Sequence, residues 1–311
     1  MPDSAKAFAA ETYDYADVRA VADGLDLSEP VAVTLVRRGY RTPDQARAFL
    51  AADESHPASA FDSMEEIVSV IETALQAGAR ITVHGDFDVD GVCATTVMVS
   101  TLRELGAECD WLIPDRIGDG YGLSAKNVEK LAERGTALLL TVDCGITAVE
   151  EVQLAQELGM EVIVTDHHQA ADQLPNCLLL HPELSNYPFP SLCGTAVAWK
   201  LASALRAAHT TDLDLVALAT VADVVPLIGE NRSLVRRGLA EMRRGRRVED
   251  QEAPALGEAG RRRAQRRPHE PVSGAVGQRR FAVGAHHPAA ADDLGVLHRR
   301  SSVLVNRRAP A

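Results

Sequence analysis

The amino-acid sequence predicts an α/β protein with a parallel, doubly wound sheet. Between residues 81 and 180, short runs of continuous apolar residues alternate with longer segments of helical periodicity. Continuous apolar strands are buried on both faces, which is typical of parallel sheets covered by helices on each side. Ligands of such sheets bind at the carboxyl ends of the strands, so the functional residues are expected there.

A helical lead-in is predicted for residues 1–60. Its clearest signal is a capping residue, Thr42, followed by Pro43 in the first helical turn and by Asp44 near the positive end of the helix dipole. Helices in this part of the chain and directly after it are expected over residues 30–37, 42–51 and 64–77.

The alternating region and its continuation supply the remaining elements. Five strands are expected over residues 81–84, 109–113, 137–142, 161–165 and 178–180. Helices are expected over residues 91–105, 124–134, 147–158, 194–208, 212–221 and 231–243. Several of these helices end at a glycine, which is a common helix stop.

Charge is distributed unevenly along the 311 residues. The net charge of −12 argues against a simple basic nucleic-acid coat protein. From Arg236 onward, however, there are 17 Arg, no Lys and 8 acidic residues, a net charge of +9 that leaves −21 for residues 1–235. Apolar periodicity fails after about residue 247, so residues 248–311 are predicted to be an irregular, disordered Arg-rich tail. The expected organisation is therefore a lead-in (1–60), a catalytic domain (61–247) and this tail.

Cysteine usage and hydropathy predict a cytoplasmic protein without a membrane segment. The five cysteines are widely spaced and include no Cys-x-x-Cys pair, which is typical of a reduced compartment. The N-terminus has no apolar signal-peptide core, and no apolar run approaches the ~18 residues that a membrane span needs.

Acidic side chains follow the first predicted strand. Asp86, Asp88 and Asp90 occupy alternate positions, and in an extended segment such side chains point the same way. Three converging carboxylates repel one another unless a cation lies among them. His84, four residues before Asp88, would add a nitrogen ligand. Taken alone, this run is equally consistent with a solvated acidic turn.

Two later strands end in the same residue types. Asp143 follows the strand at 137–142, and Asp166, His167 and His168 follow the strand at 161–165. Asp223 lies further on, inside an apolar stretch where a lone carboxylate is costly. Each feature has an ordinary explanation as a cap, turn or polar loop, but their joint occurrence favours a metal site.

An Asp/His set without thiolates suits Mn²⁺ or Mg²⁺. Several acids can bridge two ions ~3.5–4 Å apart, an arrangement used to hydrolyse phosphate esters. Cys144, next to Asp143, is disfavoured as a nucleophile. The sequence has no phosphate-binding Gly-rich loop with Lys and no dinucleotide fingerprint.

Six ordered segments carry a resemblance to a known family. They are residues 83–91, 113–123, 142–145, 165–168, 192–195 and 218–232. Together they resemble the DHH phosphoesterase superfamily, named for its Asp-His-His triplet, and within it the RecJ-type single-strand-specific exonucleases. The resemblance covers about residues 30–245.

The resemblance implies two cation sites. One would be formed by His84, Asp88 and Asp143. The other would be formed by Asp90, Asp143, His167 and Asp223, with Asp143 bridging the two.

Further roles follow from the same resemblance. Asp86 and Asp166 would orient ligands, and His168 would contact the scissile phosphate or support a ligand. Arg116 would contact a phosphate, and Tyr121 would pack against the site or a nucleotide.

The activity implied by the resemblance is that of a hydrolase with two divalent cations, Mn²⁺ preferred and Mg²⁺ an alternative. It would digest single-stranded DNA from 5′ to 3′ in DNA repair and recombination. The partners implied are single-stranded DNA or short oligonucleotides, together with single-strand-binding protein. Two other interpretations stay open: a phosphodiesterase on short oligonucleotides or cyclic dinucleotides, and a non-catalytic binding module of the DHH fold.

The sequence departs from the family after the predicted helix at 231–243. Residues 248–311 show no Gly/Arg/Asn-rich phosphate-binding motif and no alternating strands, so the family's C-terminal domains are expected to be missing. The Arg-rich tail is interpreted as the product of a shifted reading frame. Because DNA affinity depends largely on cationic contacts, impaired digestion of long strands is expected.

Overall fold

A five-stranded parallel sheet lies at the centre of the structure, a computed structural model that describes residues 12–115, 122–206 and 212–244. The strand order is β2-β1-β3-β4-β5, and every neighbouring pair is parallel. The strands are β1 (Ile81–His84), β2 (Cys109–Leu112), β3 (Leu138–Val142), β4 (Glu161–Thr165) and β5 (Leu178–Leu180). The predicted fold class, an α/β protein with a parallel doubly wound sheet, is confirmed.

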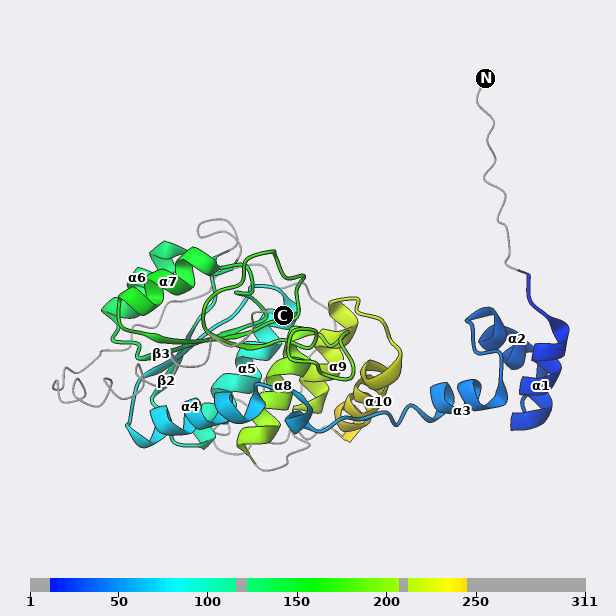
Figure 1. The fold of residues 1–311 in the computed structure, drawn as a ribbon. Helices are drawn as coiled ribbons and strands as arrows, with labels where there is room; N and C mark the ends of the chain where they lie inside the picture. Colours follow the sequence, from blue (N-terminus) through cyan, green and yellow to red (C-terminus); the bar gives the residue numbers. More distant parts are fainter. Residues whose placement is uncertain (1–11, 116–121, 207–211, 245–311) are drawn as a thin grey trace, which may run out of the picture.

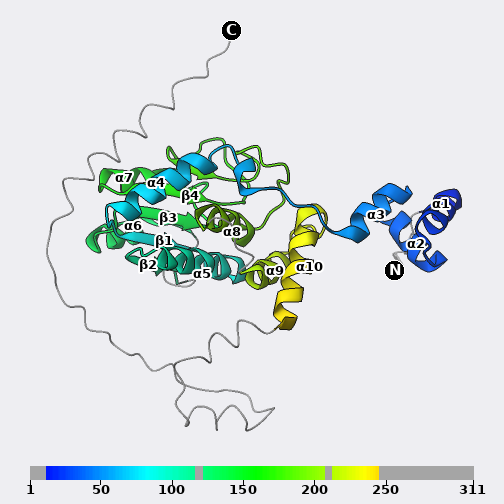
Figure 2. The same cartoon turned by 90° about the horizontal axis from the view of Figure 1, so that it is seen from below.

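Helices cover both faces of this sheet (Figure 1). One face carries α4 (Met64–Gln76), α5 (Val89–Glu104) and α8 (Gly194–Leu205), and the other carries α6 (Ala125–Glu133) and α7 (Val149–Glu157). Alternation along β3 produces the two layers, because Leu138 and Leu140 pack in the larger core while Leu139 packs in the smaller one. Figure 2 looks onto the sheet and shows β2, β1, β3 and β4 side by side in that order.

The strand order creates a switch point between β1 and β3. The chain moves from β1 outward to β2 and then returns past β1 to β3, β4 and β5. In sheets of this order the crevice at the carboxyl ends of the two central strands is the usual ligand site. The loops that follow β1 and β3 are therefore the place to look for chemistry.

Two further helices, α9 (Leu213–Ala222) and α10 (Gly229–Arg244), pack against each other beside α5 and α8. The N-terminal helices α1 (Tyr15–Leu25), α2 (Glu29–Arg37) and α3 (Pro43–Ala51) lie to one side of the sheet (Figure 1). They share a small core of their own, formed by Val18, Val21, Ala32, Leu35, Val36 and Ala46.

A linker joins the N-terminal helices to the sheet. It includes the 3₁₀ turn η1 (Ala58–Ala60). Arg232 on α10 fixes the end of α3, since its Nε donates to the Phe49 carbonyl at 2.8 Å and its guanidinium lies 3.9 Å from the centre of the Phe49 ring. The packing of α1 to α3 supports a separate lead-in, although the domain boundaries at residues 60 and 247 stay predictions.

The predicted elements match the structure to within two or three residues at their ends, but no range was predicted for α1. Helix α5 begins at Val89, two residues before the predicted start, because the Asp88 carboxylate accepts a hydrogen bond of 2.9 Å from the Gly91 N–H and caps the helix. The predicted tail at 248–311 lies outside the described residues. No helix in the described part of the chain has the length and apolar character needed to cross a membrane.

Candidate metal centre

The loop after β1 distributes its three carboxylates over two neighbouring groups. The prediction that the three carboxylates converge on one point was wrong, because the backbone is extended only as far as Asp88 and is helical after it. Asp86 lies in the loop, Asp88 is the N-cap of α5, and Asp90 lies in the first helical turn. Ligand atoms of Asp86 and Asp88 lie within 4.8 Å of one from Asp143, whereas Asp90 meets different partners.

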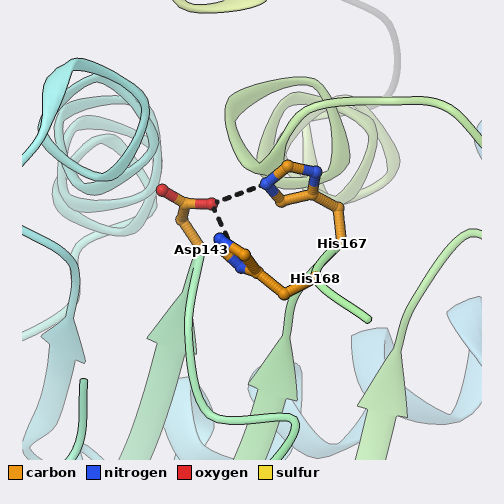
Figure 3. A group of neighbouring side chains, drawn as sticks. All are labelled: Asp143, His167 and His168. Atoms are coloured by element: carbon orange, nitrogen blue, oxygen red, sulfur yellow. Dashed lines mark ion pairs between the residues drawn. The ribbon is translucent and has the colours of Figure 1, made fainter. Parts of the chain in front are cut away.

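The loop after β3 turns sharply at Asp143. This residue has a φ of +59°, in the left-handed region that aspartate tolerates better than most residues. Gly145 follows with a φ of +109°, and a Cβ there would lie 2.9 Å from the Thr141 hydroxyl. The turn points the Asp143 carboxylate at the loop after β4, where it faces both histidines (Figure 3).

The loop after β4 is organised by the buried carboxylate of Asp166. Its oxygens accept hydrogen bonds from the backbone N–H of Ile146 at 2.9 Å and from that of His167 at 2.7 Å. The same group lies 2.7 Å from Nδ1 of His168. Asp166 thus connects the β3 and β4 loops and orients the two histidines.

The N-terminus of α8 holds Asp90. The backbone N–H groups of Gly194 and Thr195 donate to the two Asp90 carboxylate oxygens at 2.7 and 2.8 Å. Amides at a helix N-terminus are well placed to bind an anionic group, and here they fix the position of the Asp90 side chain. Only glycine fits at position 194, because a Cβ there would lie 2.3 Å from Oδ1 of Asp143.

Three carboxylates converge on one nitrogen of His167. Its Nε2 lies 3.1 Å from Oδ1 of Asp143, 3.6 Å from Oδ2 of Asp90 and 3.7 Å from Oδ2 of Asp223. Asp223 is the C-cap of α9, so this cluster joins the ends of β3 and β4 to two helices.

Burial and mutual repulsion shape the electrostatics of the cluster. Burial, reinforced by the charge of Asp90, raises the pKa of Asp143 to about 10. Burial also raises the pKa of Asp86 and that of Asp223. Fully buried His84 has its pKa lowered to about 4 by desolvation.

Asp166 and His168 behave as a pair. Burial alone would raise the pKa of Asp166, but the hydrogen bond from His168 and the backbone N–H bonds outweigh it and lower this pKa. The same hydrogen bond raises the pKa of His168 above its usual value. The His168 side chain is 41 % exposed, and its Nδ1 lies 4.0 Å from Oδ1 of Asp143.

The residues of the cluster fit divalent cations. Oδ1 of Asp143 and Nε2 of His167 are buried and make no hydrogen bond of acceptable geometry within the described residues. Ligand atoms that share one Mg²⁺ at ~2.1 Å lie at most about 4.2 Å apart, and the distances around His167 Nε2 are shorter than that. Three groups of such atoms occur in the described part of the chain: Asp143 with His167 and His168, Asp90 with His167 and Asp223, and Asp86 with Asp88 and Asp143.

Not all of the other predicted site residues belong to these three groups. His84 belongs to none of these three groups; its Nδ1 lies 3.5 Å from Sγ of Cys144. Asp86 joins a group, although the resemblance implied only an orienting role for it. Arg116 and Tyr121 lie outside the described residues.

Sequence reasoning missed the contribution of α8. The segment 192–195 was part of the resemblance, but nothing in the sequence indicated that Gly194 and Thr195 hold Asp90. It also missed His181, a buried side chain whose Nε2 lies 2.8 Å from the His168 carbonyl and supports that loop.

Residues 80–222 match the family described as DHH family, N-terminal domain. The matched segment contains all five strands of the sheet and every residue of the carboxylate and histidine cluster except Asp223.

The chain is also similar to RecJ exonucleases. It is 40 % identical over 241 residues to the single-stranded-DNA-specific exonuclease RecJ of Bacillus subtilis (strain 168), covering 76 % of this chain and 31 % of the relative. Identity to RecJ of Thermus thermophilus is 38 % over 229 residues, 72 % of this chain and 33 % of the relative. The chain thus spans about a third of the length of these curated relatives.

Solved structures agree with this likeness. The structure of exonuclease RecJ bound to manganese has a TM-score of 0.55 at 42 % identity, over 58 % of this chain and 48 % of the other. That of RecJ in complex with Mn²⁺ from Thermus thermophilus has a TM-score of 0.62 at 35 % identity, over 73 % and 33 % of the two chains.

Proposed function

We propose that this chain is the catalytic part of a metal-dependent 5′ to 3′ exonuclease on single-stranded DNA, with a role in DNA repair and recombination. The observation that carries the proposal is the cluster around Asp143 and His167 at the switch point of the sheet. Three carboxylates meet His167 there, and Oδ1 of Asp143 and Nε2 of His167 are buried without a hydrogen-bond partner among the described residues. Similar solved structures of RecJ are complexes with manganese and magnesium.

The residues that would hold the cations follow from this cluster. Asp90, His167 and Asp223 would hold one divalent ion, and Asp88 with Asp86 the other, while Asp143 reaches both groups. His84 would complete the second set. Two ions, with Mn²⁺ preferred over Mg²⁺, remain part of the proposal. Bound cations would lower the pKa of water and stabilise negative charge on the phosphate oxygens.

The remaining residues would position the substrate. His168 is partly exposed, and its hydrogen bond with Asp166 raises its pKa, so it would donate a hydrogen bond to a phosphate oxygen. Asp166 accepts from Nδ1 of His168 and so would direct the other ring nitrogen outward. Contacts of Arg116 and Tyr121 with the nucleic acid stay predictions, as do a cytoplasmic location and single-strand-binding protein as a partner.

A second candidate is a phosphodiesterase that acts on short oligonucleotides. Residues 1–235 carry a net charge of −21, and two divalent ions would offset only a small part of it. Protein affinity for long DNA depends on many cationic contacts with phosphates. This charge favours short substrates for the domain taken by itself.

Hydrolysis of labelled oligonucleotides tests the proposal. Single strands of about 5 and about 50 nucleotides, labelled at either end, would be incubated with Mn²⁺ or with a chelator. We expect release of the 5′-terminal nucleotide from short strands, slower digestion of long strands, and loss of both in Asp143→Ala. Glu66→Ala is the matched control, since it removes an exposed carboxylate of α4 outside the cluster. Cleavage that survives in Asp143→Ala, or its absence in folded protein that binds Mn²⁺, would contradict the proposal.

A further inference from the structure

A buried thiol contacts one of the histidines at the edge of the cluster. His84 ends β1 and Cys144 follows Asp143, and neither side chain is exposed to solvent. The Cys144 Sγ lies 3.5 Å from Nδ1 of His84 and 3.8 Å from the carbonyl oxygen of the same residue. The other ring nitrogen, Nε2, is buried and has no hydrogen-bond partner among the described residues.

The chemistry of these atoms favours one arrangement of hydrogens. A carbonyl oxygen can only accept, so the contact with the His84 carbonyl uses the hydrogen of the thiol. The sulfur lone pairs are then left to accept from Nδ1–H. A neutral imidazole carries one N–H, so a hydrogen on Nδ1 leaves Nε2 with its lone pair.

We propose that Cys144 is a positioning residue that holds His84 as the Nδ1–H tautomer, so that Nε2 serves as a cation ligand. This inference rests on the cation site of the proposed function. Metal-binding histidines normally donate their second ring N–H to a carboxylate, a carbonyl or water, which fixes the tautomer and the ring orientation. Here a thiol takes that place, 60 residues away in sequence.

The same contacts explain why Cys144 is not a nucleophile. Its hydrogen and its lone pairs both face His84, and the residue has no exposed surface. Burial also raises the pKa of this thiol well above its usual value, which disfavours the reactive thiolate.

The test combines a tautomer measurement in metal-free protein with a binding measurement. Two-bond ¹H–¹⁵N correlation spectra of histidine-labelled protein report which ring nitrogen of His84 is protonated. We expect Nδ1–H in the wild type and loss of this single tautomer in Cys144→Ala. Titration calorimetry with Mn²⁺ should show affinity falling by about tenfold or more in Cys144→Ala. Cys144→Ser, which keeps one donor and one acceptor, should stay closer to the wild type in both measurements.

Cys177→Ala is the matched control. Cys177 is a partly buried thiol that directly precedes β5 and packs in the smaller core, at the edge of the sheet opposite the cluster. This variant should keep both the His84 tautomer and the Mn²⁺ affinity. An Nε2–H tautomer in the wild type, or unchanged Mn²⁺ affinity in folded Cys144→Ala, would overturn the proposal. Wild-type protein that binds Mn²⁺ with the expected tautomer yet cleaves no DNA would instead count against the proposed exonuclease.

Discussion

The Asp143 carboxylate lies against His167, His168 and the N-terminus of α8, with almost none of its surface exposed. Its pKa of about 10 means that the metal-free fold holds a proton there which the unfolded chain, with a pKa near 3.8, releases. Between these values rising pH favours the unfolded state, so Asp143 makes stability fall as pH rises.

The shifted pKa values of His168 and His84 also change how the stability of the fold depends on pH. The raised pKa of His168 adds stability that is present below about 6.5 and is lost as pH rises through the higher folded value. Neutral His84 opposes this trend only between about 4 and 6.5. Above pH 6.5 the contributions of Asp143 and His168 therefore have the same sign.

We expect the free energy of unfolding of metal-free protein to be lower at pH 9 than at pH 7. The decrease should be smaller in Asp143→Asn, which has no proton to release. Urea titrations with a chelator measure both quantities, and Glu66→Gln is the control. Mg²⁺ at 100 times its Kd should restore about 2.7 kcal/mol to the wild type, because it binds only the folded state. Equal pH dependence in the wild type and Asp143→Asn would refute this account.

At the scale of elements, the connection between α9 and α10 contains strain. Val224 directly follows Asp223, is 84 % exposed and has a φ of +62°. A β-branched residue is a clear outlier in the left-handed region, where an L-residue loses roughly 1–2 kcal/mol. The described chain shows no burial of the Val224 side chain that would offset this cost.

Val224→Gly should therefore stabilise the protein. Removal of the Cβ relieves the conflict, while the extra backbone freedom of glycine in the unfolded chain costs about 0.5–1 kcal/mol. We expect a net gain of about 0.5–1 kcal/mol, measured by urea denaturation. Val224→Ala, which keeps the Cβ, should gain less, and destabilisation by the glycine variant would show that the valine makes a favourable contact.

The elements and the edge of the sheet that carries the site could be predicted because their signals are local. Apolar runs marked the strands, and parallel strands bring their carboxyl ends to one edge, so Asp143 and His167 were expected to meet. The contact of Asp90 with Gly194 and Thr195 could not be predicted, since it joins two helices more than 100 residues apart. The division of the carboxylates after β1 was missed because it depends on where Asp88 caps α5.

At the scale of the whole molecule, a buried ion pair connects distant segments. Lys200 of α8 donates to Glu230 of α10 at 2.6 Å, and both side chains are almost fully buried. Glu230 also accepts from the Tyr187 hydroxyl at 2.8 Å and from the backbone N–H of His56 at 3.0 Å. One carboxylate thus joins α8, α10, the loop before α8 and the linker to the N-terminal helices.

Lys200→Met should destabilise the fold strongly. It leaves Glu230 buried without its cation, a change that typically costs about 3–5 kcal/mol. The double variant Lys200→Met with Glu230→Leu should recover most of that loss, since it removes the buried charge as well. Urea denaturation of the single and double variants measures their free energies of unfolding, and Lys126→Met of α6 is the control for loss of a lysine. If Lys200→Met were as stable as the wild type, water would have to reach the Glu230 carboxylate.

The same carboxylate sets an order of events during synthesis on the ribosome. His56 and Glu230 are separated by 174 residues, which take about 9–35 s to translate at ~5–20 residues per second. The helices α1 to α3 emerge first and can bury their own small core at once. Their linker can dock only after Glu230 has emerged, so the nascent chain carries a folded but untethered N-terminal part for most of its elongation.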